Sequence, residues 1–251
     1  MHSASSLPRQ TMSTSQTAAS QPALGLASVF SDKPIEQFAA GSPLFWEGDQ
    51  AKHVFEVVEG VLRIFKILGD GRRAITGFLY PGDLVGVSMR AAYLYNAEAV
   101  TPVKVRRFSS VSFQEAINLS PELRPQLFAK LCDEMASAQD QMVLLSRKNA
   151  EERICSFLLL LAKRVSRDNN LSTEVEIPMT RLDMADYLGL TIETVSRTIT
   201  SLIGRGIITQ AGRHDISIKK LDTMLRLAGN GEVDEPRASS REYSRQAVWP
   251  S

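Results

Sequence analysis

Cysteine and histidine are scarce in this sequence, and their scarcity excludes several kinds of site. Two cysteines, Cys132 and Cys155, are too few for a cluster that needs four thiolate ligands. The three histidines, at positions 2, 53 and 214, show no spacing typical of metal or haem ligands. No nucleophile is matched with a base, and no phosphate-binding loop is present. We therefore expect no catalytic residue, no metal and no cofactor. Both cysteines are interpreted as small buried apolar residues of a reducing compartment, with a redox role as the alternative.

Long apolar runs and a strong net charge are also absent. The longest apolar run covers residues 154–162, includes Ser156, and is too short to cross a bilayer. The first residues show no basic cluster followed by an apolar core, so we expect no export, no membrane partner and a cytoplasmic location. The formal net charge of +1 gives no sign of nucleic-acid binding. However, DNA binding requires only a local basic face, so the charge must be considered region by region.

The chain divides into segments of different composition. Ser, Thr, Gln and Ala dominate residues 1–27, and Gly, Glu, Ser and Arg dominate residues 229–251, so we expect a disordered arm and a flexible tail. In residues 28–110, short apolar runs alternate with Gly-containing turns and show no helical period, which indicates an antiparallel barrel or sandwich. The expected strands of this segment are residues 43–45, 53–59, 60–68, 72–79 and 103–109.

Residues 111–147 contain a stretch of helical periodicity that begins at about residue 120. Apolar residues recur there at alternating three- and four-residue steps, the pattern of a coiled-coil seam. A second stripe of Leu123, Leu127 and Leu131 follows an adjacent face, so one stripe can pack on the barrel and the other on a partner chain. We expect a homodimer; the alternative is a single wide stripe buried within one subunit. The expected seam consists of Phe128, Leu131, Met135, Ala138, Met142 and Leu145.

Residues 148–228 show the order helix, strand, helix, turn, helix and hairpin. Thr180 is expected to cap the second helix of this segment, and Asp183 three residues later completes a variant of the capping box. Gly189 can take the left-handed conformation that ends this helix, and Thr191 can cap the next one. Two helices joined by such a turn are typical of a helix-turn-helix.

The last of these helices has an apolar and a polar face. Ile192, Val195, Ile199 and Leu202 are expected to anchor it on the domain core. The opposite face carries Thr191, Glu193, Thr194, Arg197 and Thr200. An arginine there can form paired hydrogen bonds with guanine, and a carboxylate can accept one from the amino group of cytosine. The alternative is an ordinary capped helix pair with Arg197 in solvent.

A hairpin after this helix is expected to form a wing. Two alternating stretches, residues 207–210 and 215–218, flank a tip that contains Arg213. Hydroxyl groups at helix starts and a cationic wing tip suit phosphate oxygens. The residues expected to contact the DNA backbone are Thr180, Thr191, Thr194, Thr200 and Arg213.

Residues 30–225 resemble the CRP/FNR superfamily of bacterial transcription regulators, most specifically over residues 179–197, which contain E-x-x-S-R. The resemblance implies an α+β fold with a cyclic-nucleotide-binding-like β-roll, a long dimerisation helix and a C-terminal winged helix-turn-helix. It implies that Glu193, Ser196 and Arg197 read the bases of a TTGAT…ATCAA inverted repeat. It also implies that the two reading helices of a dimer lie about one turn of DNA apart, roughly 34 Å.

The resemblance further indicates which signal the N-terminal domain can receive. Residues 81–84 resemble the start of a cyclic-nucleotide phosphate cassette, but Tyr95 and Asn96 occupy the positions of its Arg-Ser pair, with Arg90 as a possible substitute. With no cysteine cluster either, the chain resembles the FixK-type branch, whose activators control genes for microaerobic respiration and nitrogen fixation. A regulator gated by a cyclic nucleotide or another small molecule, and a denitrification regulator of the same superfamily, are the alternatives.

The turn at residues 69–73 is a candidate contact with RNA polymerase. Arg72 and Arg73 beside Asp70 are expected to make a protruding charged tip, and surface loops of this domain contact the polymerase in the family that the chain resembles. The alternative is a solvated turn without a partner.

Overall fold

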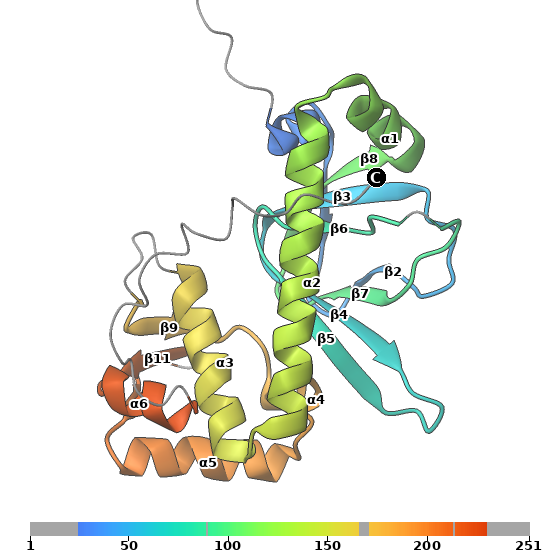
Figure 1. The fold of residues 1–251 in the computed structure, drawn as a ribbon. Helices are drawn as coiled ribbons and strands as arrows, with labels where there is room; N and C mark the ends of the chain where they lie inside the picture. The colour runs from blue at the N-terminus through green and yellow to red at the C-terminus, as the bar shows by residue number, and fades with distance from the viewer. Residues whose placement is uncertain (1–24, 89, 166–170, 213, 230–251) are drawn as a thin grey trace, which may run out of the picture.

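The short apolar runs of the N-terminal half form two four-stranded antiparallel sheets (Figure 1). The computed structural model describes residues 25–88, 90–165, 171–212 and 214–229. Residues that alternate along the strands point between the sheets, and there Phe55, Val57, Leu62 and Val105 are buried together. One sheet has the order β1 (Ile35–Phe38), β8 (Val103–Ser109), β3 (His53–Glu59) and β6 (Leu84–Val85); the other has β2 (Pro43–Phe45), β7 (Asn96–Ala99), β4 (Leu62–Ile67) and β5 (Arg73–Leu79).

Most of the expected strands are confirmed. β2, β3 and β8 have the expected bounds, and β4 and β5 lie within theirs. β1, β6 and β7 were not predicted from the sequence. The reason is clearest for β7, where the residues NAEA have little intrinsic preference for a strand but pair on both sides, with β2 and with β4.

Three helical segments cover one end of this domain. A short 3-10 helix, η1 (Leu26–Phe30), and α1 (Ser110–Leu119) share a core with Leu123, the first residue of α2 (Leu123–Arg147). Leu26 is buried in that core, so the expected disordered arm is wrong for residues 25–27, while residues 1–24 lie outside the described part. Of the expected tail, only Gly229 is described.

The C-terminal domain follows α2 directly. In order it contains α3 (Ala150–Val165), β9 (Glu174–Glu176), α4 (Arg181–Leu188), α5 (Ile192–Gly204), β10 (Ile208–Gln210), β11 (Asp215–Ile218) and α6 (Leu221–Leu227). The strands form a small antiparallel sheet of order β10-β11-β9. The side chains of α3 that face the other elements, such as Ile154, Phe157 and Leu158, are buried in the centre of the domain. Figure 1 shows α2 running along the β-sheets to the helices of this domain.

These elements confirm the α+β fold of a β-roll, a long helix and a winged helix-turn-helix. In the described residues, no helix combines the length and the apolar character that crossing a membrane requires. The same residues contain no group of three or more potential ligands that could hold a metal ion.

Candidate DNA-reading surface

The turn between α4 and α5 has the chemistry that its sequence predicts. The hydroxyl oxygen of Thr180 accepts a hydrogen bond from the backbone N–H of Asp183, and the Asp183 carboxylate accepts one from the backbone N–H of Thr180, both at 3.1 Å. Gly189 ends α4 with φ +62°, where a side chain would strain the backbone. Thr191 then caps α5 by accepting from the N–H of Thr194 at 3.2 Å. The two helices are therefore joined by a short turn with both ends capped.

The apolar face of α5 packs on the domain core, with one correction. Val195, Ile199 and Leu202 are buried there as expected. Ile192 is not: 42% of its surface is exposed. It lies in the first turn of the helix, beyond the edge of the core, and Leu190 of the preceding turn packs against the core instead.

The opposite face of α5 is polar and uncovered. Glu193, Ser196, Arg197 and Thr200 are all exposed, and their spacing of three, four and seven residues from Glu193 places them on one side of the helix. Among the described residues, Arg197 has no ion-pair partner within 4 Å. This face can therefore present a carboxylate, a hydroxyl and a free guanidinium group together.

The carboxylate of this face stays ionised at neutral pH. The pKa of Glu193 lies below its usual value because the carboxylate accepts a hydrogen bond from its own backbone N–H at the start of α5. A hydrogen bond from Thr191 and the attraction of Arg197 lower this pKa further. The group is accordingly a hydrogen-bond acceptor, which is the form that a cytosine amino group requires.

The residues expected to contact phosphates have different environments. Thr180 donates its hydroxyl hydrogen to Asp183 at 2.7 Å, and the hydroxyl oxygens of Thr191 and Thr194 lie 3.0 Å apart, so all three hydroxyl groups already have a hydrogen-bond partner within the protein. Their contact with phosphate stays a prediction, as it does for the exposed Thr200. Arg213 lies outside the described residues.

The long helix α2 leaves its expected seam uncovered. Phe128, Met135 and Met142 are 69%, 59% and 68% exposed, and Leu131, Ala138 and Leu145 are exposed as well. In the second stripe, Leu123 is buried and Leu127 packs on the same core. Residues 25–88, 90–165, 171–212 and 214–229 do not cover the seam, so the alternative of one wide stripe buried within a single subunit is wrong for this part of the chain.

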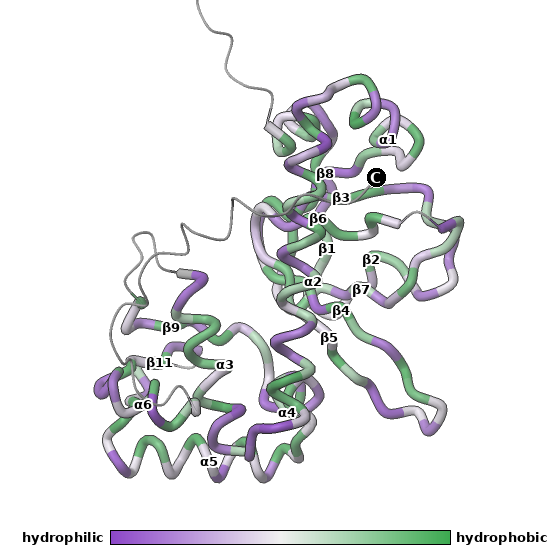
Figure 2. Tube along the Cα trace, in the orientation of Figure 1, coloured by the Kyte–Doolittle hydropathy of each residue, from purple (hydrophilic) through white to green (hydrophobic). Residues whose placement is uncertain are grey.

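Only one of the two arginines at the β4–β5 turn protrudes. Arg72 is 77% exposed and pairs with Asp70 at 2.7 Å, and Figure 2 shows hydrophilic residues at this tip. Arg73 was expected beside it, but its guanidinium group points to α4, where it pairs with Asp186 at 2.8 Å and with Asp183 at 2.7 Å. The expectation of a two-arginine tip is thus wrong for Arg73, because those carboxylates lie within its reach.

The positions of the expected cyclic-nucleotide cassette are engaged within the protein. The hydroxyl oxygen of Tyr95 accepts a hydrogen bond from the backbone N–H of Gly86 at 3.1 Å, and burial raises the pKa of Tyr95 to about 12. Asn96 is buried, accepts from the N–H of Glu47 and donates to the carbonyl of Phe65. Neither residue offers a positive charge to a phosphate.

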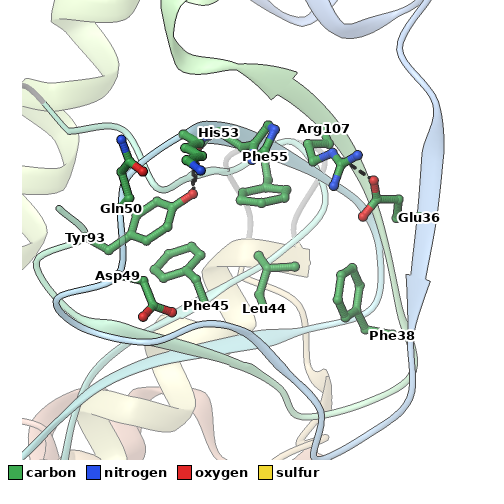
Figure 3. A pocket seen from close by; sticks show the side chains of 11 residues that line it. Glu36, Phe38, Leu44, Phe45, Asp49, Gln50, His53, Phe55, Tyr93 and Arg107 are labelled. Atoms are coloured by element: carbon green, nitrogen blue, oxygen red, sulfur yellow. Dashed lines mark hydrogen bonds and ion pairs between the residues drawn. The ribbon is translucent and has the colours of Figure 1, made fainter. Parts of the chain in front are cut away.

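An open pocket in the β-roll is lined by residues that include Phe45, His53 and Tyr93. Phe45 and Tyr93 stack there with ring centroids 3.7 Å apart, and Arg107 is paired with Glu36 at 2.9 Å (Figure 3). The pocket has a volume of about 370 Å³. Arg107 already has a carboxylate partner, whereas Lys52, which also lines the pocket, has no ion-pair partner within 4 Å among the described residues.

Arg153, which was not predicted as a functional residue, connects the long helix to the helix-turn-helix. Its guanidinium group donates to the carbonyls of Leu145 and Lys148 at the end of α2, and to those of Leu188 and Gly189 at the end of α4. Carbonyl groups at helix ends lack partners within the helix, so one arginine satisfies two helix ends at once. No local sequence pattern predicts this role, because the partners of Arg153 lie up to 36 residues away in the chain.

The comparisons with known proteins agree with this geometry. Residues 35–120 match the model of the cyclic nucleotide-binding domain, and residues 152–227 match that of the Crp-like helix-turn-helix domain. The chain is 43% identical over 192 residues to the nitrogen fixation regulation protein FixK of Azorhizobium caulinodans, covering 76% of this chain and 77% of that one. It is 32% identical over 201 residues to the fumarate and nitrate reduction regulatory protein of Escherichia coli K12, covering 79% and 78%. The structure of FixK2 from Bradyrhizobium japonicum is similar with a TM-score of 0.72 and 33% identity, covering 78% of this chain and 96% of that one.

Proposed function

Because this chain belongs to the CRP/FNR family of transcription regulators, with FixK- and FNR-type relatives and a helix-turn-helix DNA-binding domain, we propose that it is an activator that reads a TTGAT…ATCAA-like inverted repeat as a homodimer. The proposal includes no catalytic step and places the protein in the cytoplasm, where its DNA lies. Its partners are double-stranded DNA, a second copy of the chain and RNA polymerase.

The observation that carries the proposal is the uncovered polar face of α5. A major groove admits one α-helix, and a reading helix must bring hydrogen-bonding side chains to the base edges while its other face stays on the protein. The exposed Glu193, Ser196 and Arg197 can supply such hydrogen-bonding side chains, and the buried Val195 and Ile199 hold the other face on the protein. The free Arg197 suits guanine, and the ionised Glu193 suits the amino group of cytosine.

The uncovered seam of α2 supports the homodimer. Exposed methionine, leucine and phenylalanine side chains on one flank of a 25-residue helix are a poor surface to leave in water. A second copy of the same helix would cover them by knobs-into-holes packing. An inverted repeat has the same twofold symmetry as such a pair.

A binding titration tests the proposed function. We expect the purified protein to bind a duplex with two TTGAT half-sites, whose centres are about one helical turn apart, more tightly than a duplex of scrambled sequence and equal composition, by a factor of about 10³ or more at physiological salt. Both titrations must be made at the same salt concentration because phosphate contacts make affinity salt-dependent. Equal affinity for the two duplexes would contradict the proposal.

The regulated genes are proposed from the relatives. Two proteins named for regulation of nitrogen fixation share 41% and 43% identity with this chain, which favours genes of microaerobic respiration or nitrogen fixation over denitrification genes. Arg72, the exposed arginine of the β4–β5 turn, is the proposed polymerase contact. Footprinting across the genome of the source organism would show both the half-site and the genes next to it.

A regulator gated by a cyclic nucleotide is the second candidate, because residues 35–120 match the cyclic nucleotide-binding domain and the β-roll has an open pocket. We expect cyclic AMP and cyclic GMP to produce no heat of binding at micromolar concentrations in calorimetry. The physical reason is that Tyr95 and Asn96 bond to the protein itself and provide no charge for the cyclic phosphate. A saturable heat would contradict this expectation and favour the gated regulator.

A further inference from the structure

The two domains of the chain share one apolar core. Phe65 and Phe78 of the β4–β5 sheet are buried in the same cluster as Phe157 of α3 and Tyr187 of α4. The ring centroid of Phe78 lies 5.3 Å from that of Tyr187 and 6.2 Å from that of Phe157. Most of the attraction in such a core is apolar and has no preferred direction, so it fixes the angle between the domains less tightly than hydrogen bonds do.

Hydrogen bonds between charged side chains, which do have a preferred direction, lie beside this apolar core at α4. Asp183 is only 1% exposed, and its Oδ1 accepts hydrogen bonds from Arg63 at 2.9 Å and from Arg73 at 2.7 Å. Its Oδ2 accepts from Thr180, so that one carboxylate both caps α4 and binds two arginines of the β-roll. Arg73 also donates to Asp186 one turn further along α4, at 2.8 Å. Planar guanidinium groups bonded at two points restrict rotation as well as distance.

A second polar contact joins the domains at another place, and here the arginine lies on the C-terminal domain and the carboxylate on the β-roll. Arg164 of α3 donates to Asp83 of the β5–β6 turn at 3.3 Å and lies over the ring of Tyr80, 4.6 Å from its centroid. The same turn accepts a hydrogen bond from Lys130 of α2 through the carbonyl of Gly82. Polar contacts thus hold the C-terminal domain on the β-roll at two separate places, and the shared apolar core belongs to the same interface.

The orientation of α4 decides where the reading helix points. α5 follows α4 after a capped turn of three residues, and Arg153 ties the end of α4 to the end of α2. The seam of α2 in turn sets where the second reading helix of a dimer lies. An error in the angle of α4 would therefore change the separation and the direction of both reading helices.

We propose that Asp183, Asp186, Arg63 and Arg73 are positioning residues that hold the reading helix at one angle to the dimer seam and so determine which half-site spacing the protein accepts. This proposal rests on the proposed function as a dimeric reader of inverted repeats. None of the four residues needs to touch DNA, and three of them are more than four-fifths buried at the side chain.

The test uses Arg73 because Asp183 also caps α4. The full-length parent, Arg73→Gln and Arg73→Lys are titrated with inverted repeats whose spacer is one base pair shorter, unchanged or one base pair longer, and with a single half-site. Each base pair moves the second half-site by about 3.4 Å and turns it by about 35°. Lys104→Gln, which removes one positive charge and an ion pair with Glu59 inside the β-roll, is the matched control.

We expect the parent and the control to lose at least about tenfold in affinity when the spacer changes by one base pair. Arg73→Gln should lose less than about threefold while its affinity for a single half-site stays within about twofold of the parent. Arg73→Lys, which keeps the charge, should restore most of the spacing preference. If thermal unfolding shows that Arg73→Gln is not folded, Asp186→Asn takes its place in the same titrations.

Two results would overturn the proposal. A folded Arg73→Gln or Asp186→Asn protein with the spacing preference of the parent shows that these contacts do not position the reading helix. A parent that does not distinguish the inverted repeat from scrambled DNA overturns the proposed function and this inference with it, and the parent titration alone identifies that case.

Discussion

Arg197→Ala is expected to abolish the preference of the protein for TTGAT half-sites over scrambled DNA. Arg197 is the free guanidinium group of the polar face of α5, and a bidentate contact between arginine and guanine contributes about 1–3 kcal/mol of discrimination. A dimer carries two such contacts, so the expected loss is about 2–6 kcal/mol when the two half-sites act independently. Fluorescence anisotropy with the specific and the scrambled duplex, at one salt concentration, measures the ratio of affinities.

Arg226→Ala is the matched control for the change at Arg197. Arg226 is an exposed arginine of α6, outside the reading helix, and its guanidinium group bonds to Thr223 of the same helix. Both variants lose one positive charge, so a general electrostatic effect would weaken them equally and for both duplexes. A protein with Arg197→Ala that still prefers the specific duplex as strongly as the parent would show that the assignment of the base-reading residues is wrong.

The helix-turn-helix could be predicted because its determinants are close in the sequence. The pairs Thr180–Asp183 and Thr191–Thr194 each span three residues, and Gly189 acts through its own backbone conformation. Hydrogen bonds of this range depend little on the rest of the fold. The same holds for the seam of α2, where a regular step along one helix identifies the face before any partner is known.

The environments of Ile192 and Arg73 could not be predicted from such local patterns. The helical period correctly placed Ile192 on the side of Val195, but it could not show that the core ends before the first turn of α5. Arg73 follows Arg72 in a polar turn, and only the fold brings it to carboxylates more than 100 residues away. The polar composition of a turn predicts that its side chains are exposed to solvent. It cannot predict an ion pair between domains, because that pair depends on how the two domains pack together.

The contacts between the β-roll and the C-terminal domain could not be predicted from the sequence for the same reason. The capping role of Asp183 was predictable, but its partner Arg63 lies 120 residues earlier in β4, where apolar residues do not alternate regularly. The pairing of β4 with β5 is irregular between Ile64 and Phe65, where β5 contains one extra residue, Thr76, and this breaks the regular alternation of faces. A contact between two residues so far apart is revealed by correlated substitutions among related sequences, which a single sequence cannot show.

Met135→Glu is expected to convert the protein into a monomer that no longer binds the inverted repeat tightly. Met135 lies near the middle of the exposed seam, so in a dimer its replacement would bury two carboxylates against apolar side chains of both helices. Linking two reading heads raises the affinity for a double site by about 10²–10⁴ over a single one, and this factor should disappear. Sedimentation should give a mass near 27.7 kDa instead of twice that value, and titration should show equal affinity for the inverted repeat and a single half-site.

Ala136→Glu separates the effect of the seam from that of a new charge on α2. Ala136 is exposed on the neighbouring flank of the helix, which also carries Asp133 and Asp140, and a carboxylate there stays in water in a dimer that uses the seam. This variant should remain a dimer and keep the affinity of the parent for the inverted repeat. If Met135→Glu also stayed a dimer, the chains would have to meet through another surface, and the register of the two reading helices would no longer follow from α2.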